Sequence, residues 1–113
     1  MVAVIDGVVR DLSKDYADGT PNFEIHVPMD RADGLPYQIG ERVKVSVNIG
    51  GVEYQAGLRA TTENKYAWVC PDLYASDGQR LKLGRLLIDA GYKANDQVHL
   101  LADGTLLTIH QRV

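Results

Sequence analysis

The chain has 113 residues, a formal net charge of −3 and an apolar share of 45%. This length suits one domain, predicted here as residues 1–113, and the composition excludes intrinsic disorder, collagen-like repeats and coiled coil. One cysteine excludes an internal disulfide, and no apolar run approaches the roughly 18 residues that cross a bilayer. We therefore expect a cytoplasmic protein with no membrane partner. The negative charge argues against a surface coated with basic residues for non-specific nucleic-acid binding.

The first half of the chain is predicted to be mostly β. Residues 13–21 are rich in turn formers and predict an exposed loop, and residues 29–32 can form one helical turn. Gly7 predicts a bend in the first strand, and Pro28 ends the second because proline cannot donate to a β-ladder. Gly50-Gly51 supplies the positive φ angles of a two-residue hairpin turn. The strands expected from apolar alternation are 2–12, 23–27, 42–49 and 52–58.

The second half is predicted to contain the longer of two helices. Apolar residues at Leu83, Leu86, Leu87 and Ala90 have helical spacing, and Gly91 is placed as the left-handed cap. Asp103-Gly104 predicts a tight turn between the last two strands. The strands expected here are 66–70, ended by Pro71, 98–101 and 106–110. The whole chain is therefore expected to form seven strands and two helices.

Two pairs of segments indicate an internal duplication. Residues 23–28 match 66–71, and residues 39–45 match 94–100. The first match aligns Trp68 with Ile25 and Cys70 with Val27, which predicts that both side chains point into the core. We expect a fold that is mainly β with two helices: a seven-stranded open pseudobarrel with pseudo-twofold internal duplication.

This order of elements resembles the DNA-binding pseudobarrel domain. That domain occurs in plant-specific transcription factors and in effector or target-recognition domains of restriction endonucleases. The resemblance is carried by Tyr66–Pro71, by the helix 83–91 and by Ala94–Val98, which look like the family's proline-ended strand, its helix and the entry to its closing hairpin. The resemblance implies a bacterial double-stranded DNA-binding module with a fused or separate nuclease domain.

In that family two loop arms grip the major groove. By position, the resemblance assigns the first arm to residues 10–22 and the second to residues 59–66. Arginine can contact guanine or phosphate, asparagine can bind adenine, and hydroxyl groups can bind phosphate oxygens. Lys44 and Lys65 are expected to support phosphate contacts. The DNA-binding residues that the resemblance implies are Arg10, Ser13, Lys14, Tyr16, Asn22, Arg59, Thr61, Thr62, Asn64 and Lys65.

The acidic residues of the arms oppose this interpretation. Asp11, Asp15, Asp18 and Glu63 lie in the same two segments and repel a polyanion, so the arms carry as many carboxylates as cations. The alternative is a β-barrel that binds a protein or a small ligand. For each of these residues taken singly, a position in an ordinary solvated loop is an equally good explanation.

No catalytic, metal or cofactor site is predicted. His99 and His110 lie within cross-strand reach but lack a third ligand, and Cys70 is expected to be a small core residue rather than a nucleophile. Asp30 and Asp33 are the closest carboxylate pair, although nothing indicates an apolar pocket around them. No phosphate loop, nucleophile elbow or dinucleotide fingerprint occurs. We therefore expect a protein that is not an enzyme.

Overall fold

Nine strands and two short helices follow one another along residues 2–110, the part of the chain that the computed structural model describes. Residues 1 and 111–113 of the predicted domain lie outside this range. The elements in chain order are β1 (Ala3–Asp11), β2 (Phe23–Pro28), the 3-10 helix η1 (Met29–Arg31), β3 (Arg42–Ile49), β4 (Val52–Ala60), β5 (Tyr66–Val69), β6 (Asp72–Tyr74), β7 (Arg80–Lys82), α1 (Leu83–Asp89), β8 (Gln97–Asp103) and β9 (Leu106–Ile109).

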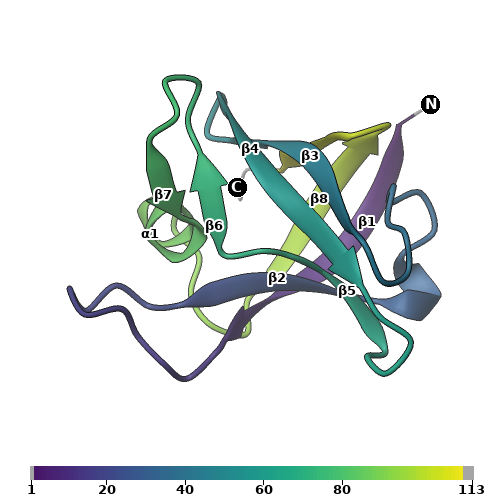
Figure 1. The fold of residues 1–113 in the computed structure, drawn as a ribbon, viewed down its shortest axis with the longest axis horizontal. Coiled ribbons are helices and arrows are strands. Elements are labelled where there is room, and N and C mark those ends of the chain that lie inside the picture. The colour runs from purple at the N-terminus through teal and green to yellow at the C-terminus, as the bar shows by residue number, and fades with distance from the viewer. Residues whose placement is uncertain (1, 111–113) are drawn as a thin grey trace.

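Seven of the strands form a closed β-barrel (Figure 1). Their order is β3-β9-β8-β1-β2-β5-β4, and β4 pairs back with β3. The pairing of β3 with β9 is parallel, and the other neighbours are antiparallel. The expected open character is therefore wrong: β3 has a partner on each side, so the seven strands leave no free edge between them.

Alternating burial along the strands fills the interior of the barrel. Ile25, Val27, Val45, Leu58 and Leu100 are nearly inaccessible to solvent, while their neighbours along each strand face outward. The alternation in the sequence correctly predicts this division, because successive side chains of a strand point to opposite faces. All seven predicted strands are present, and they are the seven strands of the barrel.

The predicted two-residue turn is present at Gly50-Gly51, and β1 changes its pairing partner near Gly7. Gly50 and Gly51 have positive φ angles of 62° and 88°, and Ile49 pairs with Val52 across them, so β3 and β4 form a hairpin with a two-residue turn. Around Gly7, β1 changes partners: residues 3–8 pair with β8 and residues 8–11 pair with β2. A side chain at Gly7 would meet the backbone of β2 at His26.

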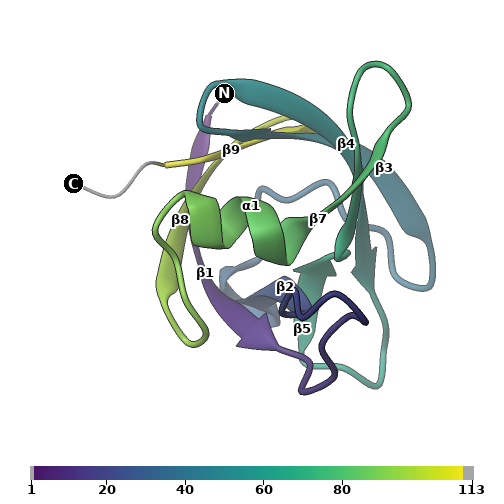
Figure 2. The ribbon, with the colours of Figure 1, turned by 90° about the vertical axis from the view of Figure 1, so that its left-hand side faces the viewer.

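Helix α1 lies across one end of the barrel (Figure 2). Leu83 and Leu87 are fully buried there, and Leu86 and Ala90 pack against the same core. Gly91 follows the helix with a φ of 93°, as the pattern predicts for a left-handed cap. The expected turn at 29–32 forms only the 3-10 helix η1, so α1 is the single α-helix of residues 2–110.

The hairpin of β6 and β7 is absent from the sequence prediction. Its strands have three residues each, too few for an alternating pattern to be recognised. The hairpin continues the sheet beyond β4, where Gln55 pairs with Tyr74. The hairpin therefore extends the sheet next to β4, outside the seven strands of the barrel.

The predicted inward positions of Trp68 and Cys70 are wrong. Both side chains lie on the outer face of β5 or directly after it, and it is Val69, 1% exposed, that points inward opposite Ile25. The alignment matches the buried Ile25 with Trp68 instead of with one of the buried neighbours Ala67 and Val69, and a shift of one residue exchanges the two faces of a strand. Trp68 and Cys70 are half-buried surface residues.

Candidate nucleic-acid interface

The two predicted arms lie at opposite ends of one strand pair. The first arm joins β1 to β2, and the second joins β4 to β5. Because β2 and β5 are antiparallel, the start of β2 is beside the end of β5 (Figure 1). A strand of this length spans about 17–20 Å, which exceeds the roughly 12 Å width of a B-DNA major groove. The arms therefore do not meet at one point of the surface.

The first arm is an internally bonded loop. Arg10 Nη1 donates to Asn95 Oδ1 at 3.1 Å, and the hydroxyl of Tyr16 donates to Asn22 Oδ1 at 3.1 Å. The backbone N–H of Ser13 donates to Asp11 Oδ1 at 2.8 Å. Lys14 is exposed. Three of the predicted DNA-binding side chains in this arm, Arg10, Tyr16 and Asn22, are thus engaged within the protein.

Contacts with β7 and α1 hold the first arm in place. Lys82 Nζ lies 4.1 Å from the centre of the Tyr16 ring, and it also pairs with Asp72 at 3.2 Å. Burial raises the pKa of the Tyr16 phenol. Thr20 is 2% exposed and accepts a hydrogen bond from Arg85 of α1 at 3.4 Å. These contacts make the arm part of the folded body.

The second arm is shorter and leaves more of its polar groups exposed. Thr61 Oγ1 accepts from the backbone N–H of Asn64 at 3.2 Å, and the carbonyl of Lys65 accepts from Met29 N at 3.0 Å. Thr62 and the side chain of Lys65 lie at the surface, as does Arg59 at the end of β4. Together with Ser13 and Lys14 of the first arm, these exposed side chains are available to a ligand.

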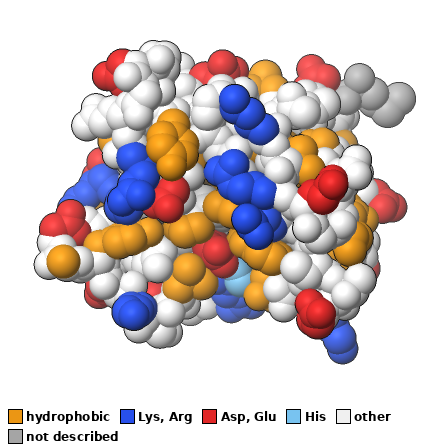
Figure 3. All heavy atoms as spheres, viewed as in Figure 1, with side chains coloured by type: hydrophobic (Ala, Val, Ile, Leu, Met, Phe, Trp, Pro, Cys, Tyr) orange, Lys and Arg blue, Asp and Glu red, His pale blue; other side chains and the backbone are white. Residues whose placement is uncertain are grey.

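Three cations form what we call the basic strip: Arg42 and Lys44 on β3, and Arg59 on β4. Arg42 and Arg59 are direct cross-strand partners, and all three residues are exposed on the outer face of the barrel. No salt bridge joins any of them to a carboxylate of residues 2–110. Figure 3 shows Lys and Arg side chains grouped in the middle of one face of the molecule.

This arrangement of like charges opposes folding. Two cations directly opposite each other in a sheet destabilise the pair by about 0.2–1 kcal/mol. An anionic ligand bound on this face would remove that repulsion. The positive charge of the basic strip therefore suits a polyanion.

Aromatic side chains continue the same face beyond the basic strip. The rings of His26 and Tyr66 stack with centres 4.1 Å apart, and Tyr66 meets Trp68 edge to face at 5.7 Å. Trp68 is the cross-strand partner of both Arg59 and His26. His26 Nε2 lies 2.8 Å from Glu24 Oε1, and both side chains are largely covered. The aromatic residues thus form a firm, partly exposed surface next to Arg59.

Cys70 lies between the basic strip and Glu24 on this outer face. Burial raises the pKa of its thiol above the ordinary value, while the nearby charges of Arg42 and Arg59 act in the opposite direction. A thiol with a raised pKa is mostly protonated at neutral pH and is a poor nucleophile.

The remaining chemical candidates form no site. His99 Nδ1 pairs with Asp6 at 2.5 Å, and its carbonyl accepts from the backbone N–H of His110 at 2.8 Å. Asp30 and Asp33 are both exposed. Within residues 2–110 no group of three His, Cys, Asp or Glu residues is arranged to hold a metal ion, and no helix there is long and apolar enough to cross a bilayer.

The basic strip could have been found in the sequence in part. Lys44 is among the residues expected to support phosphate contacts, and alternation places Arg42 on the same face. A two-residue turn at Gly50-Gly51 fixes the register of the hairpin, and that register sets Arg42 opposite Arg59. The position of Trp68 beside Arg59 depends on the pairing of β4 with β5 and has no such local signal.

In comparisons with known proteins, no family model, no curated protein and no solved structure matches the chain.

Proposed function

We propose that this protein is a double-stranded DNA-binding module that uses the basic strip and the second arm. The observation that carries the proposal is the gathering of Arg42, Lys44 and Arg59 on one outer face without a carboxylate partner among residues 2–110. Phosphate contacts from arginine and lysine provide most of the affinity in such complexes and fix the orientation of the protein.

The second arm supplies the groups for sequence discrimination in this proposal. Arg59, at its base, can form a bidentate contact with guanine, and the Asn64 side chain can bind adenine. Thr61, Thr62 and Lys65 add contacts to phosphate oxygens. With the arms at opposite ends of β2, the second arm enters the groove while the basic strip lies along the neighbouring backbone.

The first arm has a supporting role in this proposal. Lys14 is its exposed cation, and it lies among Asp11, Asp15 and Asp18, which repel phosphate. Arg10, Tyr16 and Asn22 contact DNA only where their internal hydrogen bonds are exchanged for bonds to the ligand, whereas the exposed Ser13 hydroxyl can contact it directly. The carboxylates of the first arm therefore restrict where a duplex can lie, and the arm contributes little to the attraction between protein and DNA.

We include the pseudo-twofold duplication in the proposal, because the strand pairing supports it. Exchanging β2 with β5, β1 with β4 and β8 with β3 maps the antiparallel pairings β1–β2 and β1–β8 onto the antiparallel pairings β4–β5 and β4–β3. A shared plan of this kind agrees with the pseudobarrel resemblance. On that resemblance, a nuclease domain, fused or separate, is the expected partner.

Fluorescence anisotropy with a labelled duplex of random sequence, carrying 5′-hydroxyl ends, tests the proposal. Each neutralised phosphate adds about −0.9 to the slope of log affinity against log salt, so phosphate contacts from Arg42, Lys44 and Lys65 predict a slope of about −2.7 and an affinity loss of about 40-fold between 50 and 200 mM salt. In the Arg42→Gln/Arg59→Gln double variant the slope should fall to about −1.8, because Lys44 and Lys65 still neutralise two phosphates.

The matched control is Lys93→Gln, because Lys93 is an exposed cation of the loop between α1 and β8, outside the basic strip. It should retain the wild-type slope. Absence of binding at 50 mM salt, an unchanged slope in the double variant, or tighter binding to the single strand than to the duplex would each overturn the proposal.

A further inference from the structure

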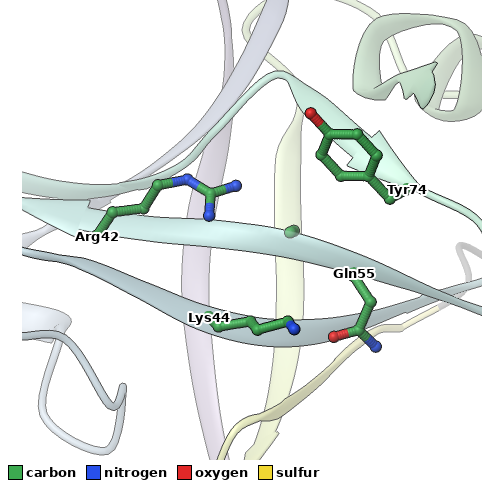
Figure 4. A pocket seen from close by; sticks show the side chains of 5 residues that line it. Arg42, Lys44, Gln55 and Tyr74 are labelled. Atoms are coloured by element: carbon green, nitrogen blue, oxygen red, sulfur yellow. The ribbon is translucent and has the colours of Figure 1, made fainter. Parts of the chain in front are cut away.

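A polar pocket opens on the outer face where β3, β4 and β6 come together. Arg42, Lys44, Gln55, Ala56 and Tyr74 line it, and its volume is about 270 Å³. Figure 4 shows the Arg42 guanidinium and the hydroxyl end of Tyr74 directed toward each other, with the Lys44 and Gln55 side chains extended below them. The pocket exists because the β6–β7 hairpin continues the sheet beyond β4 and carries Tyr74.

Gly57 and one hydrogen bond influence where the Arg42 and Gln55 side chains lie. Gly57 is the cross-strand partner of Lys44, and a Cβ atom at Gly57 would collide with Nε and Cζ of Arg42. Absence of a side chain at Gly57 thus lets the guanidinium lie over β4. Gln55 Nε2 donates to Ser46 Oγ at 3.0 Å, which turns the amide oxygen of Gln55 away from Ser46.

The functional groups of the pocket differ in kind. The guanidinium of Arg42, the ammonium of Lys44 and the hydroxyl of Tyr74 are hydrogen-bond donors, and two of them are cationic. The amide oxygen of Gln55 is an acceptor, and no carboxylate lines the pocket. This set suits a ligand with several anionic oxygens next to a group that donates a hydrogen bond.

The size of the pocket narrows the ligand class. Its volume of about 270 Å³ is roughly nine times the ~30 Å³ that one water molecule occupies in the liquid. A bare phosphate ion leaves much of that space unfilled, whereas a drug-sized ligand occupies pockets of about 300–1,000 Å³. A small phosphorylated molecule fits between these limits.

We propose that this pocket binds the phosphate monoester of a hydroxylated sugar, such as that of a nucleotide. Arg42, Lys44 and the Tyr74 hydroxyl hold the phosphate, and the Gln55 amide oxygen accepts a hydrogen bond from a sugar hydroxyl. The same chemistry comes from a free sugar phosphate or from the phosphorylated 5′ end of a nucleic-acid strand. The site goes beyond the duplex proposal, since Gln55 and Tyr74 do not belong to the basic strip.

Calorimetric titration of the full chain with ribose 5-phosphate, inorganic phosphate and ribose tests the site. Ribose 5-phosphate should bind about five-fold more tightly than inorganic phosphate, the effect of one additional neutral hydrogen bond, and ribose should not bind. Gln55→Leu should remove that difference and leave the affinity for inorganic phosphate unchanged. Tyr74→Phe should weaken both phosphates about ten-fold, because the lost bond is to a charged group.

Lys93→Gln is the control and should bind all three probes as the wild type does, and thermal unfolding of each variant verifies that it is folded. Equal affinity of the wild type for ribose 5-phosphate and inorganic phosphate, no effect of Gln55→Leu, or no binding of either phosphate would overturn the assignment. The 5′-hydroxyl duplex used for anisotropy lacks a terminal monoester, so loss of one activity with retention of the other identifies which proposal fails.

The source of the ligand follows from a competition experiment. A duplex with 5′-hydroxyl ends should displace ribose 5-phosphate at the concentration at which it binds, because it uses Arg42 and Lys44 as well. A 5′-phosphorylated duplex should displace it at a lower concentration if the pocket recognises strand ends, and at the same concentration if the natural ligand is a free sugar phosphate. Absence of displacement by either duplex would contradict the shared use of Arg42 and Lys44.

Discussion

Gly84, in the first turn of α1, is the position where a single methyl group should disturb the structure most directly. A Cβ atom there would overlap the backbone carbonyl oxygen of Pro21 at the end of the first arm. Neither the Pro21 carbonyl nor the helix can move freely. Pro21 directly follows the buried Thr20 in the chain, and α1 is fixed by the fully buried Leu83 and Leu87. The Gly84→Ala variant must therefore shift the helix or the arm.

The expected cost follows from two opposing terms. Overpacking a close contact costs about 1–3 kcal/mol, and a rigid backbone neighbour places Gly84→Ala near the upper limit of about 3 kcal/mol. Alanine improves the helix propensity by about 1 kcal/mol relative to glycine. The net loss of unfolding free energy is thus about 2 kcal/mol, which lowers the thermal midpoint of a domain of this size by about 8 °C.

Gly57→Ala is the matched comparison. Its added methyl group also meets a neighbour, but that neighbour is the flexible end of the Arg42 side chain, which can rotate into solvent. Its unfolding free energy should change by less than about 1 kcal/mol, because the lower chain entropy of alanine offsets the lost packing. The displaced guanidinium should nevertheless weaken binding of ribose 5-phosphate and of duplex DNA.

Thermal unfolding followed by circular dichroism, with urea unfolding as a second measure, separates the two glycines. A Gly84→Ala protein as stable as the wild type would refute the close approach of α1 to the first arm. Equal destabilisation by both substitutions would refute the distinction between a backbone neighbour and a flexible side chain.

Three further predictions concern the arms and the outer face. Cys70 should react slowly with iodoacetamide up to pH 8 and faster only at higher pH, since burial raises its pKa; rapid labelling at pH 7 would contradict this environment. Hydrogen bonds from Thr20 lower the pKa of Asp18, so their contribution to stability is present above the ordinary pKa of 3.8 and is lost as the pH falls through the lower folded value. Asp18→Asn should therefore reduce the thermal midpoint at pH 6 but not at pH 2, and equal midpoints at pH 6 would contradict it. Lys82→Met removes the cation from Tyr16 and should speed tryptic cleavage in the first arm, with unchanged digestion as the contrary outcome.

Most of the barrel can be predicted from local patterns. Period-2 alternation, proline at strand ends and glycine in turns are effects of single residues and their immediate neighbours, and they locate all seven barrel strands and α1. The hairpin of β6 and β7 cannot be predicted, because three-residue strands have no detectable period. Barrel closure cannot be predicted for another reason: the parallel pairing of β3 with β9 joins segments about half a chain apart, and no local sequence signal specifies it.

The candidate site is predictable only where it depends on a hairpin. The face of Arg42 and Lys44 follows from alternation, and the turn at Gly50-Gly51 then sets Arg59 opposite Arg42. In contrast, Trp68 was expected in the core, because an alignment based on similarity of residue type ignored the two-residue period. When the segments of a proposed β duplication are compared, the buried faces must coincide as well as the residue types.

The net charge of −3 acquires a different meaning once the strands are placed. Around the first arm, acidic side chains accept bonds from backbone N–H groups, as Asp11 does from Ser13 and Asp18 does from Thr20, and these charges shape the loop. The cations of the basic strip do not shape a loop in this way, and the fold holds them close together although their charges repel one another. Acidic residues in loop turns therefore coexist with a basic face, and the local potential of that face, rather than the total charge, determines whether an anion binds there.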